Sequence, residues 1–167
     1  MVAATMSPVS AQSSDAARRD YFRAVASFFN LPAGEVAILG DWGIPPDEIP
    51  VVLFMARRAG VSPEALLALR DAGQSWSVLA GRYRVTAAAL HLPVGDDAPT
   101  GSLSGVYEQY RTLPVGEWGT IQLADADVVA LVNVRIISQS LPLPAERVIA
   151  RAGTTDTFVD LYAALKR

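Results

Sequence analysis

Apolar side chains recur at three- and four-residue spacing along most of the chain, which is the periodicity of amphipathic helices. Between Asp15 and Phe29 they form one continuous stripe, which Asn30 and Pro32 end. Similar segments, separated by Gly, Pro and Ser, cover residues 33–39, 46–59, 62–72, 75–83, 103–112, 144–151 and 157–165. Residues 86–90 are predicted as a short turn. With the segment discussed next, the pattern predicts a compact all-α domain of seven to nine short helices.

The segment 125–139 fits both a helix and a strand. Asp125 is a good N-cap residue, and the internal repeat described below favours a helix. The run after Asp125 is nevertheless rich in β-branched residues, and Asn133 and Arg135 alternate with apolar neighbours as they would in a strand. We favour a buried helix, and a strand is the alternative.

The helix at 46–59 has clear boundary signals. Pro46 has no N–H to leave unpaired at the first helical position, and Gly60 is suited to close the helix. Residues 49–56 are apolar nearly all round, so this helix is predicted to be buried. Ser62 is then predicted to cap the next helix.

Two stretches of the chain share one layout. In each, an acid precedes an apolar helix, a Pro starts a short helix, an Arg and a Gly close it, and an aromatic residue follows. The positions are Asp47, Val51, Val52, Arg58, Pro63, Leu67, Arg70, Gly73 and Trp76, then Asp125, Val128, Val129, Arg135, Pro144, Val148, Arg151, Gly153 and Phe158. The alternative is that the two layouts agree by chance, because Pro at the start of a helix and Gly after its end are common in all helices. A true repeat implies that the helices at 47–59 and 125–139 pack together.

Residues 15–167 are predicted to form a single helical domain. Residues 91–102 shift in composition towards Gly, Pro and Asp, which indicates a loop. This loop would separate two similar three-helix halves, at 15–90 and 103–167, around one core.

Residues 1–14 carry no charge and are predicted to be a disordered tail or the remnant of a signal peptide. The small residues 9–11 resemble the cleavage site of such a peptide. We expect a periplasmic or secreted protein if this interpretation holds, and a cytoplasmic one otherwise. No apolar run approaches the roughly 20 residues of a transmembrane helix.

The composition removes several classes of chemistry. The 167 residues are 51% hydrophobic and 19% charged, as in a folded globular protein. The net charge of −3 argues against nucleic-acid binding through bulk charge. Because the chain has no cysteine, one histidine and one lysine, thiol catalysis, thiolate and most histidine metal sites, and Schiff-base chemistry are excluded. We expect no catalytic residue, no metal site and no cofactor.

The remaining candidates for chemistry have simpler explanations. His91 stands alone, and a lone histidine is typical of a structural or solvated position. Asp96 and Asp97 lie in the loop but are not part of a calcium-binding motif. Glycoside hydrolysis would need a buried acid, such as Glu35 or Glu48. An enzyme is therefore the third hypothesis.

Residues 52–70 resemble a helix-turn-helix motif. Ala56, Gly60, Val61 and Leu66 match the small residue, the turn glycine and the packing positions of that motif. The resemblance implies two helices joined by a tight turn, the second of which would face DNA.

This resemblance supports an alternative function, a cytoplasmic DNA-binding transcriptional regulator that uses residues 46–72. The positions that would face the groove are Ser62, Pro63, Glu64 and Ala68, which make a poor surface for reading bases. Residues 51–91 nevertheless hold five arginines against two acids. The candidate nucleic-acid-binding residues are Arg57, Arg58, Arg82 and Arg84.

Aromatic residues supply the leading hypothesis. The candidate partner-binding patch is Tyr107, Tyr110 and Arg111, because Tyr and Arg are enriched at interface hot spots. By contrast, Trp42, Trp76 and Trp118 adjoin glycine-marked turns and are expected to anchor the core. The leading hypothesis is an exported, non-enzymatic helical protein that binds another protein or contributes to the cell envelope.

Overall fold

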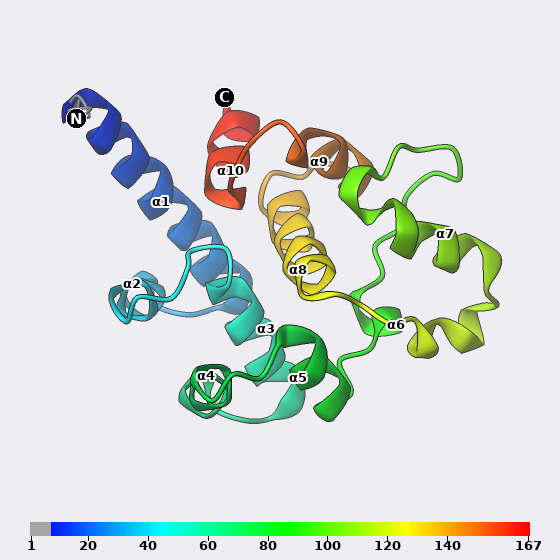
Figure 1. The fold of residues 1–167 in the computed structure, drawn as a ribbon. Helices are drawn as coiled ribbons and strands as arrows, with labels where there is room; N and C mark the ends of the chain where they lie inside the picture. Colours follow the sequence, from blue (N-terminus) through cyan, green and yellow to red (C-terminus); the bar gives the residue numbers. More distant parts are fainter. Residues whose placement is uncertain (1–7) are drawn as a thin grey trace, which may run out of the picture.

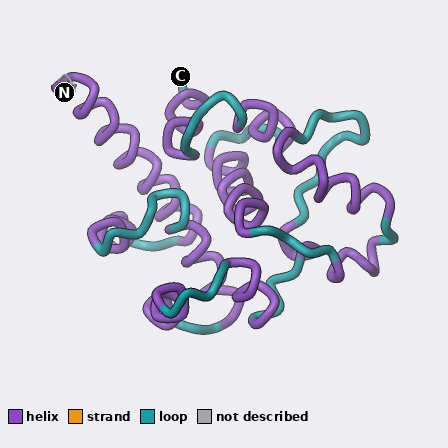
Figure 2. Tube along the Cα trace, in the orientation of Figure 1, coloured by secondary structure: helices purple, strands orange, loops and turns teal. Residues whose placement is uncertain are grey.

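The computed structural model describes residues 8–167, which form ten α-helices, two short 3-10 helices and no strand (Figures 1 and 2). The predicted all-α fold is confirmed, with more helices than the seven to nine expected. The segment 87–90, predicted only as a short turn, is a helix, and the 3-10 helices at 101–103 and 115–120 are too short for a periodic pattern to reveal. The elements are α1 Pro8–Phe29, α2 Ala33–Asp41, α3 Ile49–Ala59, α4 Pro63–Asp71, α5 Trp76–Arg82, α6 Ala87–Leu90, η1 Gly101–Leu103, α7 Ser104–Thr112, η2 Val115–Thr120, α8 Asp125–Ser140, α9 Ala145–Ala152 and α10 Phe158–Lys166.

Helix α1 begins at Pro8, well before the predicted start at Asp15. Residues 8–14 are thus helical, where a tail was expected. They carry no apolar stripe, but each residue added to an existing helix gains a hydrogen bond at little cost. This end of α1 projects from the body of the protein (Figure 1). Residues 1–7, with the rest of the expected tail or signal remnant, lie outside the described residues, and export stays a prediction.

Local signals set several helix ends as predicted. The Ser62 hydroxyl accepts a backbone hydrogen bond at 3.2 Å at the start of α4. Gly60 ends α3 in the left-handed conformation, with a φ of 68°. Helix α3 begins at Ile49 and not at Pro46, because residues 45–48 first form a turn, in which the Pro45 carbonyl accepts the Glu48 N–H at 2.8 Å.

Helices α3 and α8 pack against each other at the centre of the fold (Figure 1). Residues 49–56 of α3 are all buried, as are most residues between 128 and 137 of α8. The segment 125–140 is a helix, so the favoured prediction is confirmed and the strand alternative is wrong. Helices α1, α5, α6 and α9 also contact α8. Burial on so many sides outweighs the weak helix propensity of the β-branched residues.

One polar side chain, Asn133, lies fully buried in this core. Its amide Nδ2 donates to the backbone carbonyls of Asp47 and Val129, both at 2.8 Å. Its Oδ1 accepts a hydrogen bond from the hydroxyl of Tyr21, which is also fully buried. Asn133 therefore links α1, the start of α3 and α8 through hydrogen bonds that are shielded from solvent.

We expect Tyr21→Phe to lower the free energy of unfolding by about 1–3 kcal/mol, because it leaves the buried Oδ1 of Asn133 without a donor. Tyr162→Phe is the matched control: Tyr162 is also buried, and its hydroxyl forms none of the hydrogen bonds found among residues 8–167. Urea unfolding measures both variants. Equal losses would show that the Asn133 network contributes nothing specific.

Candidate functional site

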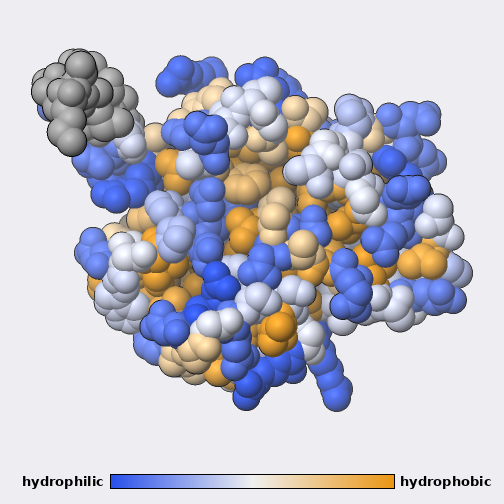
Figure 3. Space-filling view, viewed as in Figure 1, coloured by the Kyte–Doolittle hydropathy of each residue, from blue (hydrophilic) through white to orange (hydrophobic). Residues whose placement is uncertain are grey.

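An apolar groove lies between α2 and α4, with Leu53 of α3 in its lining. Its main part has a cavity volume of about 400 Å³, and a second part of about 350 Å³ continues past Trp42 and Glu64. The apolar lining consists of Leu31, Ile38, Leu39, Trp42, Ile44, Leu53, Pro63, Leu67 and Ala68. We call this feature the α2–α4 groove. Apolar residues are visible around α2 in Figure 3.

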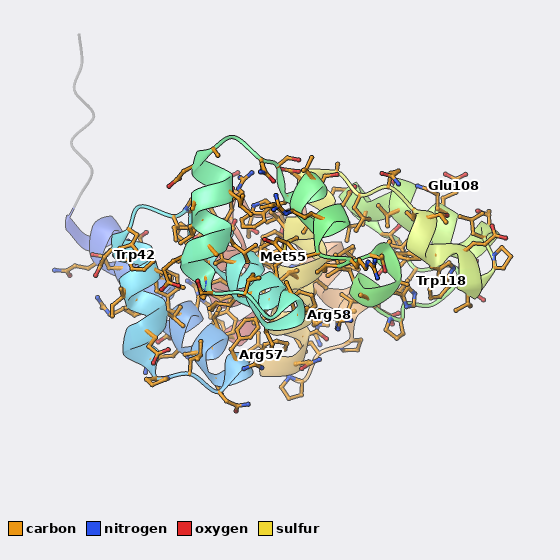
Figure 4. The ribbon with its side chains drawn as sticks, turned by 90° about the horizontal axis from the view of Figure 1, so that it is seen from below. Trp42, Met55, Arg57, Arg58, Glu108 and Trp118 are labelled. Carbon is orange, nitrogen blue, oxygen red and sulfur yellow. The ribbon has the colours of Figure 1, made fainter. Side chains whose placement is uncertain are left out.

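Two large apolar side chains of the groove are exposed to solvent. Trp42 is 52% exposed and Ile38 is 51% exposed, whereas Trp76 is only 1% exposed. The expectation that Trp42 anchors the core is therefore wrong. Trp118 is partly buried, and it lies at the opposite end of the molecule from Trp42 (Figure 4).

Close helix packing places Trp42 outside. A Cβ atom on Gly40 would lie 2.9 Å from the ring of Phe22, so this ring of α1 packs directly on the α2 backbone. Gly43 then turns the chain with a φ of 78°, a conformation that favours glycine. Trp42 sits between these two glycines at the end of α2, beside the groove.

The charged side chains that line the groove are all acidic. They are Glu35 from α2 and Glu64 and Asp71 from α4. The basic residues of the surrounding helices have other contacts. Arg57 donates to the carbonyl of Phe29, the Arg58 guanidinium lies 5.8 Å from the Phe54 ring centre, and Arg70 pairs with Glu48 at 3.1 Å. The groove therefore presents negative charge around an apolar floor.

Two other carboxylates bind the starts of distant helices. Both oxygens of Asp47, just before α3, accept the N–H of Phe158 at the start of α10, at 3.1 Å. Asp125, the first residue of α8, accepts the N–H groups of Trp76 and Ser77 at the start of α5, at 3.0 and 2.8 Å. Each carboxylate satisfies donors that a helix start leaves free.

Glu48 is a third carboxylate with structural partners. It accepts the indole N–H of Trp76 at 3.0 Å and bonds to Arg70, whose guanidinium stacks 4.6 Å from the Trp76 ring centre. The Arg70 Nη1 also lies 3.6 Å from a carboxylate oxygen of Asp125. These acids hold helix ends and a buried tryptophan. Within residues 8–167, no three Asp, Glu or His side chains gather into a set that could hold a metal ion.

The tyrosines of the expected partner-binding patch are buried. The Tyr107 hydroxyl donates to the Leu92 carbonyl at 2.9 Å, and the Tyr110 hydroxyl donates to the Ala87 carbonyl at 2.6 Å. Burial raises the pKa of Tyr107 to about 12 and that of Tyr110 further. Arg111 is exposed and bonds to the backbone of the 91–102 loop. Tyr107 and Arg111 therefore bind that loop and Tyr110 binds α6, so the three residues do not form an exposed aromatic patch.

His91 packs in the same cluster. Its ring centre lies 4.7 Å from that of Tyr110 and 4.3 Å from that of Trp118. Burial, with a further contribution from Arg135, lowers the pKa of His91. Arg135 in turn donates to the carbonyls of His91 and Ala89 at 3.1 and 3.2 Å. His91 thus has the structural setting expected for a lone histidine.

The four candidate nucleic-acid-binding arginines are all exposed, and each has different neighbours. Arg57 bonds to a backbone carbonyl, and Arg58 stacks on a phenylalanine. The guanidinium of Arg82 lies 5.7 Å from the ring centre of Tyr83, and Arg84 occupies a turn with a φ of 55°. The Ser62 hydroxyl caps its own helix, and Pro63 and Glu64 line the groove.

Comparison of the chain with models of protein families, with curated proteins and with solved structures found no match. Across residues 8–167, no helix combines the length and the hydrophobicity needed to cross a membrane.

Burial raises the pKa of Asp47 above its ordinary value of 3.8, and the backbone donors of α10 oppose this shift. A raised carboxyl pKa means that the folded protein holds the proton more tightly than the unfolded chain. The contribution of Asp47 to stability is therefore greatest below pH 3.8 and falls as the pH rises through the raised pKa.

We expect Asp47→Asn to remove this pH-dependent loss, because the amide oxygen still accepts the Phe158 N–H without carrying charge. The stability of the variant should improve relative to the wild type as the pH rises from about 3 to about 7. Urea unfolding across this range measures the difference, with the exposed Asp96→Asn as the control for charge removal. A constant difference would contradict the assigned cause.

Proposed function

We propose that this chain is a non-enzymatic protein-binding module and that the α2–α4 groove is its docking site. The observation that carries the proposal is the half exposure of Trp42 and Ile38 at the groove. Tryptophan is among the commonest energetic anchors of interfaces. Adjacent exposed apolar side chains around a concave surface are typical of an interaction site.

The setting of the carboxylates supports a binding role over a catalytic one. Asp47 and Asp125 accept backbone hydrogen bonds from helix starts, and Glu48 is bound to Arg70 and Trp76. A general acid or base needs access to a substrate proton. Glu48 and Asp125 border a cavity of about 530 Å³, but all three carboxylates already accept hydrogen bonds from backbone, indole or guanidinium donors.

A protein partner fits the groove better than DNA. Glu64 and Asp71 on α4 are exposed, and both would repel phosphate. Pro63 offers no backbone donor, and with Glu64 it lines the apolar groove. The helix that the motif resemblance assigns to base reading thus presents apolar and acidic groups.

We also propose that the fold consists of two similar three-helix halves around one core. The reciprocal capping supports this proposal, because Asp47 and Asp125 occupy matching positions in the two stretches. Each binds the aromatic residue of the other stretch, Phe158 or Trp76, at a helix start. Arg58 and Arg135, another matching pair, both lie over the ring of Phe54.

A library of displayed peptides, selected on the intact protein, tests the docking site. We expect the enriched peptides to bind Trp42→Ala at least about tenfold more weakly than the wild type, because truncating an interface tryptophan removes its buried contacts. The exposed Val78→Ala and Val115→Ala variants lie outside the groove and should bind like the wild type.

Trp42→Ala should also unfold within about 1 kcal/mol of the wild type, since the side chain is half exposed. This check separates lost binding from lost folding. Enriched peptides that bind Trp42→Ala as tightly as the wild type would overturn the proposed function, as would a selection that enriches none.

A further inference from the structure

We infer that the partner segment is a short basic amphipathic helix that presents apolar side chains to the α2–α4 groove and Lys or Arg to its rims. This inference rests on the proposed function and specifies its ligand. Two features of the groove carry it, the shape of its walls and the sign of its charge.

The walls favour a helix as occupant. Helices α2 and α4 have nine residues each, so each wall is about 13 Å long at roughly 1.5 Å per residue. The floor comes from Leu53 of the buried helix α3. Helical walls offer no unpaired strand edge to an extended peptide, whereas a helix satisfies its own backbone. About two and a half turns, with apolar residues at i, i+3 or i+4 and i+7, match the length of the groove.

The charges favour a basic helix. Glu35 stands on one wall, and Glu64 and Asp71 stand on the other. None of the three takes part in an ion pair among residues 8–167. A ligand with Lys or Arg beside its apolar stripe would place positive charge near both rims. A second copy of this chain carries a net charge of −3 and fits this requirement poorly.

Two synthetic peptides of about fourteen residues test the inference. Both carry leucine at the helical spacing given above; one has lysine at the remaining positions, and the other has glutamate. We expect the lysine peptide to bind at least about tenfold more tightly in a fluorescence-anisotropy titration, with an affinity that falls as salt is added. Its circular dichroism should show helix forming on binding.

Matched variants separate the groove from general attraction between opposite charges. The groove variant Glu35→Gln/Glu64→Gln/Asp71→Asn should weaken the lysine peptide about tenfold. The control variant Asp96→Asn/Asp97→Asn/Glu108→Gln removes the same amount of charge from exposed positions outside the groove and should bind like the wild type. Glu108 lies at the end of the molecule opposite Trp42 (Figure 4).

Each other outcome overturns a defined part of the account. Equal affinity for the two peptides would refute the basic partner, while the groove could still be the docking site. Display selections that depend on Trp42 but enrich acidic sequences would have the same consequence. Equal weakening in both triple variants would show nonspecific attraction and refute the inference. If neither synthetic peptide binds, the inference of a basic helix is refuted. If, in addition, the peptides enriched by display bind Trp42→Ala as tightly as the wild type, the proposed docking site is refuted as well.

Discussion

The dry contact between α3 and α8 is the interaction on which the rest of the structure depends. Both helices are apolar on nearly every side, so they are stable only where other helices cover them. Burial also encloses polar groups near the entry to α3. Asn133 binds the Asp47 carbonyl there, and Asp47 and Asp125 direct their carboxylates to the starts of α10 and α5. The central pair therefore fixes the outer helices by directional bonds as well as by packing.

The groove is a consequence of this arrangement. Helix α3 is buried against α8, while Leu53 remains available as the floor between α2 and α4. The two flanking helices are short and joined to α3 by turns, so they form walls that do not close over it. Gly40 brings α2 against Phe22 and leaves Trp42 at the rim. Core packing thus leaves an apolar surface uncovered beside acids that form no ion pair with any residue from 8 to 167.

Local chemistry made much of the fold predictable from the sequence. Ser62 and Gly60 act on their own helix ends, and a buried apolar helix over 49–56 follows from residue type alone. The packing of the helix at 47–59 on that at 125–139 was expected from the repeat and is present, but the long-range side-chain partners were not predictable. Nothing near Asn133 in the sequence points to Tyr21, and the carboxylate of Asp47 binds a helix start more than a hundred residues away in the chain.

The same limit explains the errors at the candidate site. Trp42 and Trp76 both adjoin glycine-marked turns, so the sequence does not distinguish them, yet only Trp76 meets Glu48 and Arg70. Tyr107 and Tyr110 are residue types found at interfaces, but backbone carbonyls from α6 and the loop draw their hydroxyls inward. The acidic groove could have been suspected from exposed acids on two short helices, but its floor depends on where α3 lies.

The three tryptophan indoles report directly on whether the α2–α4 groove binds a partner. Trp76 donates its indole N–H to Glu48, and Trp118 donates to the carbonyls of Tyr110 and Leu113, far from the groove. In a nitrogen–proton NMR spectrum of the labelled protein, titration with the lysine peptide should shift the indole signal of Trp42 and leave that of Trp118 in place. A shift of the Trp118 signal with an unchanged Trp42 signal would contradict the account.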